Sequence, residues 1–337
     1  MSQIVLGIAT SHSPLLAIDP AIWSQRGDDD RRRTATHVTD GRALSYAELE
    51  KERGAPFAAE ATLETFQRQS SLAHAALDRL ALELEAAAPD VLVIVGDDQE
   101  ELFDKSHMPA LAIYSGAEIV MHPRGEVTPN MPKWRQASVA GYAMDAAHRH
   151  PAAPAFARHL IEALIADGVD LSIATSVLDP YKAGFGHAFG FVIRRLCGGR
   201  PIPIVPVMLN TYYPPNVPTP ARCVEVGAKL AAAIRSAGGG ERVAIIASGG
   251  LTHFMCDEPF DRRVLAAVAA HDTAALAALP VEALRSGTSE ILNWVLVAGA
   301  MGGLEVSFSE YIPVRRTPVG TGIGLGFLAW RPSPPTS

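Results

Sequence analysis

The sequence is poor in cysteine and in aromatic residues, and it has no excess of positive charge. Its 337 residues include three cysteines and 7% aromatic residues, and the formal net charge is −7. The cysteines, Cys197, Cys223 and Cys256, match neither a zinc-knuckle nor a CxxC spacing, so we expect buried, reduced thiols. The arginines at 31–33 directly follow aspartates at 28–30, so this patch cancels itself. Nucleic-acid binding is therefore not expected.

Long apolar runs are also missing. No stretch approaches the ~20 uninterrupted apolar residues of a membrane-spanning helix, and the N-terminal residues lead straight into a strand-like segment. We therefore expect a cytoplasmic protein with no membrane partner. The hydrophobic fraction of 48%, against 19% charged residues, is typical of a packed globular enzyme. We expect a single catalytic domain over residues 1–337.

Short β-like runs alternate with longer amphipathic segments. This pattern predicts an α/β fold with a central, mostly parallel sheet and helices on both faces. The predicted strands are rich in isoleucine and valine and apolar on both faces, as a buried sheet requires; they span residues 4–9, 91–95, 171–175, 202–208 and 243–247, with a last strand at 323–330. Apolar residues at three- and four-residue spacing predict helices at residues 58–87, 154–166, 187–196, 222–236 and 290–301.

Residues 19–56 differ from the rest of the chain. They are charged, rich in arginine, and lack clean periodicity until residues 46–53. A segment of this length inside a compact domain is usually a functional lid or a disordered excursion. We expect a lid-like insertion here, and a frayed tail at the proline-rich residues 332–337.

Polar residues directly follow three of the predicted strands. The first strand leads to His12, the second to Asp-Asp-Gln-Glu at 97–100, and the strand at 243–247 to a Gly-Gly pair followed by His253. One histidine after a strand is more often structural than catalytic. Ligands of open α/β sheets, however, bind beyond the carboxyl ends of the strands. Three such segments at one edge therefore indicate a site.

Two further candidates are His187 and Glu290. His187 lies in the sequence GFGHAFG, which fits either a crowded backbone beside a ligand or a plain helix start. Glu290 follows Ser289, which can cap the predicted helix, so a capping role is one explanation for this acid. The next dozen residues are almost entirely apolar, and the helix start is expected to be buried. A carboxylate in such a place needs a cation.

Together these motifs resemble the LigB-type (class III) extradiol dioxygenases. That family holds the catalytic subunits of protocatechuate 4,5-dioxygenase, gallate dioxygenase and 3-O-methylgallate dioxygenase. The resemblance spans most of the chain and is carried, in order, by the motifs GIATSHSP, VIVGDDQEELF, FGHAFGF, VMLNTYYPP, ASGGLTHF, GTSEILNW and TGIGLGFLAW. It is greatest to the 3-O-methylgallate branch, which has a similar charged insertion and a similar Asp-Gln motif.

The resemblance implies a LigB-like fold, Fe²⁺ as the cofactor, and an aromatic diol and O₂ as substrates. The diol would be catechol-like, of the gallate, protocatechuate or hydroxypyridine type, and both oxygen atoms would enter the opened ring. His12 and Glu290 match iron ligands of the family. His253 matches the catalytic histidine that accepts and returns a proton, and His187 matches a histidine beside the oxygen and substrate site.

One position departs from the family pattern. Most relatives carry Asn-Asp-His where this chain has Asp-Asp-Gln at 97–99, so the second histidine ligand is missing. His37, in the insertion, is the predicted replacement, because imidazole suits Fe²⁺ better than an amide does. The alternatives are that Gln99 binds iron through its amide oxygen, or that the metal site is lost. Gln99 is otherwise expected to face the substrate, as are Tyr212 and Tyr213, which match a loop that borders the pocket in relatives.

The resemblance also leads to expectations about partners and about competing functions. A substrate carboxylate would need a local cation, and the arginines at 31–33, or Lys133 and Arg135, are the candidates, unless these are solvated surface charges. Many relatives need a small helical subunit to cover the active site, a role that the insertion at 19–56 would take here. A homodimer is the expected assembly. The alternative function is a non-redox binding or signalling protein with a degenerate metal site; a metal hydrolase is a third possibility.

Overall fold

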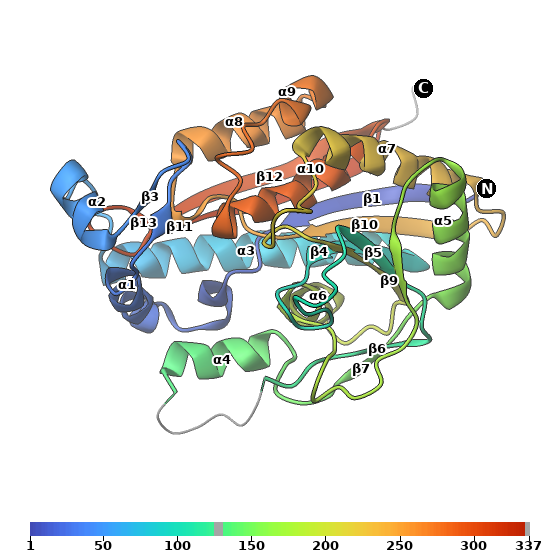
Figure 1. Ribbon diagram of the computed structural model, residues 1–337, viewed down its shortest axis with the longest axis horizontal. Helices are drawn as coiled ribbons and strands as arrows, with labels where there is room; N and C mark the ends of the chain where they lie inside the picture. Colours follow the sequence, from blue (N-terminus) through green and yellow to red (C-terminus); the bar gives the residue numbers. More distant parts are fainter. Residues whose placement is uncertain (125–130, 334–337) are drawn as a thin grey trace.

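The computed structural model describes residues 1–124 and 131–333. Its centre is a nine-stranded sheet in the order β11-β13-β1-β10-β4-β9-β5-β8, with β12 added on β13 (Figure 1). Four neighbouring strands in the middle are parallel and coincide with predicted strands: β1 (Gln3–Thr10), β10 (Arg242–Ser248), β4 (Val91–Asp97) and β9 (Ile204–Leu209). The predicted α/β fold is confirmed.

Both ends of the sheet contain antiparallel pairs, which the sequence analysis did not predict. At one end β13 (Thr321–Pro332) runs antiparallel to β1 and pairs with β12 (Leu304–Arg315) and β11 (His253–Met255). At the other end β5 (Leu111–Tyr114) runs antiparallel to β9 and carries β8 (Ser172–Ala174). The prediction that residues 171–175 lie in a buried strand is wrong, because β8 is the edge strand and Ile173 is 51% exposed.

Helices cover both faces of the sheet. Successive residues of a strand point to opposite sides, so a buried strand supplies apolar side chains to both faces. In β10, Val243, Ile245 and Ala247 join one hydrophobic cluster, and Ala244 and Ile246 join the other. The first face packs against α5 (Pro154–Ala166), α7 (Pro220–Ser236), α8 (Glu258–Ala269), α9 (Thr273–Ala277) and α10 (Ile291–Ala300). The second packs against α3 (Leu63–Ala87), α4 (Lys133–Gly141) and α6 (His187–Val192) (Figure 1).

The insertion at 19–56 is folded. It contains α1 (Trp23–Arg31), the short hairpin β2 (Thr36–His37) and β3 (Ala43–Leu44), and α2 (Tyr46–Arg53), which is the segment of predicted periodicity. Trp23 is fully buried against Phe66 of α3, with ring centroids 5.6 Å apart. Arg31, Arg32 and Arg33 each pair with the aspartate three residues earlier, so the two charge runs offset each other as expected.

Two other expectations concern the cysteines and the chain end. All three cysteines are buried and unpaired, in agreement with the prediction. Within the described ranges, no helix has both the length and the apolar character needed to cross a membrane. Of the tail predicted at 332–337, residues 334–337 lie outside the described residues, and β13 extends to Pro332.

The packing of α7 against α10 gives a test of the fold. A Cβ atom on Gly227 would lie 2.0 Å from the carbonyl oxygen of Leu296, so Gly227→Ala must force the two helices apart. We expect it to lower the free energy of unfolding by about 1–3 kcal/mol in urea denaturation, although alanine is the better helix former. Gly238→Ala, with nothing within 4 Å of the added atom, is the matched control. Equal unfolding midpoints for the two variants would contradict this packing.

Candidate metal centre

Four side chains that can bind a metal converge at the carboxyl ends of the central strands. His12 follows β1, Asp97 ends β4, His187 begins α6, and Glu290 ends the 3-10 turn Ser286–Glu290 that leads into α10. One ligand atom from each side chain lies within 4.8 Å of the others. None of the four residues is more than 9% exposed, so their charges are shielded from water.

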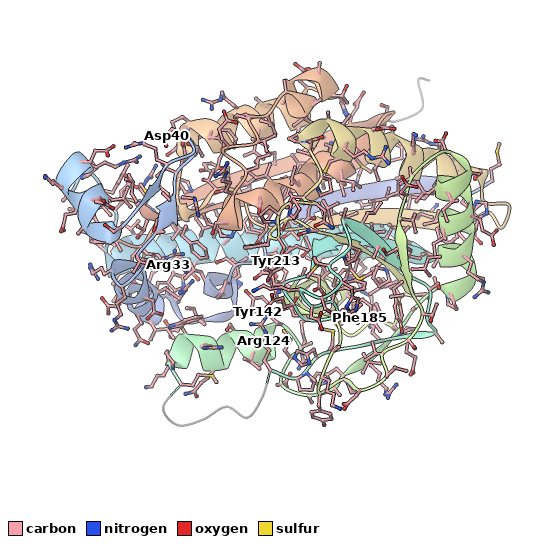
Figure 2. The ribbon with its side chains drawn as sticks, viewed as in Figure 1. Arg33, Asp40, Arg124, Tyr142, Phe185 and Tyr213 are labelled. Carbon is pink, nitrogen blue, oxygen red and sulfur yellow. The ribbon has the colours of Figure 1, made fainter. Side chains whose placement is uncertain are left out.

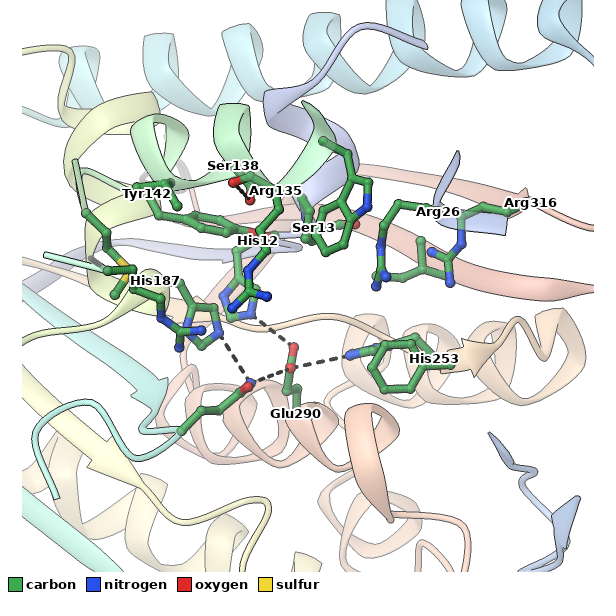
Figure 3. Close-up of a pocket in the computed structure, with 18 of the residues that line it drawn as sticks. His12, Ser13, Arg26, Arg135, Ser138, Tyr142, His187, His253, Glu290 and Arg316 are labelled. Carbon is green, nitrogen blue, oxygen red and sulfur yellow. Dashed lines mark hydrogen bonds and ion pairs between the residues drawn. The ribbon is translucent and has the colours of Figure 1, made fainter. Parts of the chain in front are cut away.

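Glu290 lies at the centre of this group (Figure 3). Its Oε2 is 3.1 Å from Nε2 of His12 and accepts a 2.6 Å hydrogen bond from the backbone N–H of Gly250. Its Oε1 is 3.3 Å from Nε2 of His253 and accepts a 2.7 Å bond from the Tyr212 hydroxyl. Burial alone would raise the pKa of Glu290, but His253 and His12 hold it well below its usual value. The carboxylate is therefore ionised.

Asp97 is the second buried carboxylate. Burial raises its pKa, and the charge of Glu290 raises it further, against the opposing effect of His187. The side-chain amide nitrogen of Gln99 donates to Oδ2 of Asp97 at 2.9 Å and lies 3.4 Å from Oε1 of Glu290. Two carboxylates this close repel each other in a buried setting. A divalent cation between them would remove that repulsion, so the donor set fits a metal ion.

Two charged residues, Glu101 and Arg124, fix the orientation of His187. Its Nδ1 is 2.8 Å from Oε1 of Glu101, which also accepts a 2.7 Å bond from Arg124. Burial, the largest single effect, would lower the pKa of His187, but Glu101, together with Asp97 and Glu290, raises it to about 9. With Nδ1 fixed in this way, Nε2 points toward the metal-binding group. Glu101 was missed in the sequence, although it belongs to the same polar segment as Asp97 and Gln99.

The other two histidines are also oriented through Nδ1. His12 Nδ1 lies 3.0 Å from the Ser248 hydroxyl, which itself donates to the carbonyl of Ala188. His253 Nδ1 lies 2.8 Å from the carbonyl oxygen of Leu251, so this nitrogen carries the proton. Both rings therefore present Nε2 to Glu290.

The structure does not bring every predicted residue to this group. His37 lies on β2, where it pairs with Ala43, and it is not among the residues that line the cavity beside the group. The prediction that it joins His12 and Glu290 is not supported, because His37 is not one of the four residues that converge there, although β2 contacts β11, the strand that begins with His253. Gln99 and Tyr212 do line the cavity, whereas Tyr213 does not.

A cavity of about 400 Å³ opens next to the group. Its wall holds Trp134, Tyr142 and Phe254 together with five arginines, Arg26, Arg33, Arg124, Arg135 and Arg316. Of these arginines, Figure 2 labels Arg33 and Arg124, and Figure 3 labels Arg26, Arg135 and Arg316. Arg33 and Arg135 were among the predicted cations; the other three were not foreseen. Arg26 and Arg33 belong to the insertion at 19–56, so that segment forms part of the wall.

The pairing of Glu101 with His187 gives a test by substitution. Glu101 is 2% exposed and serves His187, Arg124 and the backbone N–H of Gln99, so Glu101→Gln should lower the free energy of unfolding by about 3 kcal/mol. The Arg124 side chain is 41% exposed, and Arg124→Gln should cost about 1 kcal/mol or less. Urea denaturation at neutral pH measures both. Equal losses would mean that Arg124, rather than His187, is the main partner of Glu101.

Comparison with known proteins adds the family. A family model described as the catalytic LigB subunit of aromatic ring-opening dioxygenase matches residues 62–323. The matched region contains Asp97, His187, His253 and Glu290, whereas His12 and the insertion lie outside it. Comparison with curated proteins gave no match. Because the match covers most of the chain, the protein belongs to the LigB family of catalytic subunits of aromatic ring-opening dioxygenases.

Proposed function

We propose that this protein is an Fe²⁺-dependent extradiol dioxygenase that opens a catechol-like ring of the gallate or protocatechuate type. The observation that carries the proposal is the ionised, buried Glu290 between His12 and His253, with Asp97 close by. A buried cluster of this composition has no evident structural purpose, because its two carboxylates repel each other without a cation. Membership of the LigB family supplies the reaction class.

His12, Asp97 and Glu290 would hold the iron. Imidazole and carboxylate ligands suit Fe²⁺, and Asp97 takes the place of the histidine that the family pattern puts at position 99. Gln99 then donates hydrogen bonds to Asp97 and Glu290 and keeps both carboxylates in position. When bound, the iron supplies a centre where a catechol and O₂ can meet.

His253 would act on the substrate hydroxyl. Its Nδ1 proton is engaged by the carbonyl of Leu251, so a phenolic proton would be taken up and later returned at Nε2, the nitrogen that faces Glu290 at 3.3 Å. The backbone N–H of His253 donates to the Thr288 hydroxyl at 3.1 Å, which fixes the ring next to Glu290. A base held at this place converts the neutral diol into an anion at the moment of binding.

His187 would serve as a hydrogen-bond donor. In Figure 3 it lies on the other side of Glu290 from His253. Glu101 and the ring of Tyr142 keep the imidazole in one orientation, with ring centroids of Tyr142 and His187 5.6 Å apart. A donor that is fixed before the reaction stabilises developing negative charge on oxygen without reorganisation. Tyr212, whose hydroxyl donates a hydrogen bond to Glu290, would border the aromatic ring of the substrate.

The division of roles between Glu290 and His253 is testable. Glu290→Ala should lose iron, because it removes the central carboxylate, and His253→Ala should retain about one iron per chain but lose turnover. The protein is purified anaerobically, its metal is measured, and oxygen uptake is followed with catechols, gallates and hydroxypyridines. No iron and no uptake by the wild type after reconstitution would overturn the proposed function and favour a binding protein on this scaffold.

The third ligand is tested separately by metal content. Asp97→Asn should lower iron affinity by at least about tenfold, whereas His37→Ala should leave it unchanged, since His37 does not reach the cavity. Asp97→Asn also removes a carboxylate that is repelled by Glu290, so the urea midpoint of this variant should not fall. An unchanged midpoint would exclude unfolding as the cause of the lower iron affinity. Loss of iron in His37→Ala alone would reverse this assignment.

A further inference from the structure

Three arginines of the cavity wall pair with two neighbouring aspartates, of which Asp30 is fully buried. Nε of Arg316 donates to Oδ2 of Asp30 at 2.8 Å, and Nε of Arg33 lies 3.5 Å from Oδ1 of the same residue. Arg26 has one ion pair within the described part of the chain, with Asp29 at 3.7 Å. Asp29 also pairs with the exposed Arg32 at 3.2 Å. The three guanidinium groups therefore exceed the negative charge around them.

This excess charge is buried. The side chains of Arg316 and Arg26 are 3% and 11% exposed, and burial together with repulsion from Arg316 lowers the pKa of Arg26 to about 10. Among the described residues, Nε of Arg33 and one terminal nitrogen of Arg316 have no hydrogen-bond partner. Buried cations with unused donors are costly unless an anion joins them. Without a bound anion, this arrangement is expected to lower the stability of the protein.

Aromatic rings hold two of these guanidinium groups in place. The Arg26 guanidinium carbon is 4.2 Å from the ring centroid of Trp134, and that of Arg33 is 3.5 Å from the ring centroid of Phe254. Phe254 directly follows His253, so the arginines border the proposed base. In Figure 3, Arg26 and Arg316 lie on the His253 side of the cavity, across from His187.

We propose that Arg26, Arg33 and Arg316 form a subsite for a carboxylate carried by the aromatic substrate. The assignment of this anion to a ring-bearing substrate rests on the proposed function. A planar guanidinium offers parallel N–H groups that match the two oxygens of a carboxylate. Two of the three arginines come from the insertion at 19–56, outside the matched family region 62–323. The insertion therefore selects acidic over neutral diols.

The other arginines of the wall fit this role less well. Arg124 already forms an ion pair with Glu101, at 2.7 Å, and its side chain is 41% exposed. Arg135 is exposed and lies on α4, so water screens its charge. Arg135 is nevertheless the competing candidate, and it is included in the test.

The test compares acids with their neutral esters. Dissociation constants of 3,4-dihydroxybenzoate, 3,4,5-trihydroxybenzoate and their methyl esters are measured by calorimetry on the iron-loaded enzyme without oxygen. The wild type should bind at least one acid about 10- to 100-fold more tightly than its ester. Arg26→Gln and Arg33→Gln should remove most of that preference and leave ester binding unchanged. Arg31→Gln, on an exposed neighbour whose ion pair is with Asp28, should behave as the wild type.

A stability measurement guards against unfolding as the explanation. Arg26→Gln removes a cation that is repelled by Arg316, so the urea midpoint should stay the same or rise while acid binding falls. Arg316 is left intact, because it is the close partner of the buried Asp30. Equal weakening of acid and ester, loss of acid preference only in Arg135→Gln, or no binding of either acid by the wild type would overturn the subsite.

Oxygen uptake separates this proposal from the proposed function. If the acids bind in an Arg26-dependent manner but no ring is opened, the subsite stands and the dioxygenase assignment fails. If acid and ester are opened with equal KM and Arg26→Gln changes neither value, the dioxygenase stands and the subsite fails.

Discussion

The burial of one carboxylate, that of Glu290, constrains the rest of the site. The helix behind it, α10, is almost wholly apolar and buried, so neither water nor its own helix can satisfy the charge. Its partners must come from elsewhere in the sheet, and they do: His12 follows β1, Gly250 and His253 follow β10, and Tyr212 follows β9. The strand order places these chain segments at one edge, where they can meet a single side chain.

Charge alternates outward from this point. The two central carboxylates are surrounded by histidines, His187 is backed by Glu101, and Glu101 is backed by Arg124. On the other side of the cavity the balance is reversed, and Arg26, Arg33 and Arg316 outnumber Asp29 and Asp30, the acids with which they pair. A cation bound beside the two carboxylates and an anion bound beside the arginines would each balance the charge of the groups around them. In the two proposals, the metal ion would be the cation, and the carboxylate of an acidic diol would be the anion.

The matched family region and the insertion contribute different parts of the site. Residues 62–323 supply Asp97, His187, His253 and Glu290, the groups that act on the ring and on oxygen in the proposed mechanism. The segment at 19–56 supplies Arg26 and Arg33 to the wall and is anchored on α3 by Trp23. In the two proposals, the catalytic groups thus come from the scaffold, and substrate selection depends on an added element together with Arg316 of the matched region.

The sequence by itself determined the central strands, most of the long helices and the histidines and glutamate at the strand ends. Those features are local: apolar periodicity reports which face is buried, and a polar residue after a buried strand must lie at the sheet edge. The tertiary structure alone decided that Asp97 lies with His12, because the order of the main sheet brings the ends of β4 and β1 to the same place, whereas His37 belongs to a separate two-stranded sheet. It likewise brought Arg316 to Arg26 across the fold, a contact that no local pattern records.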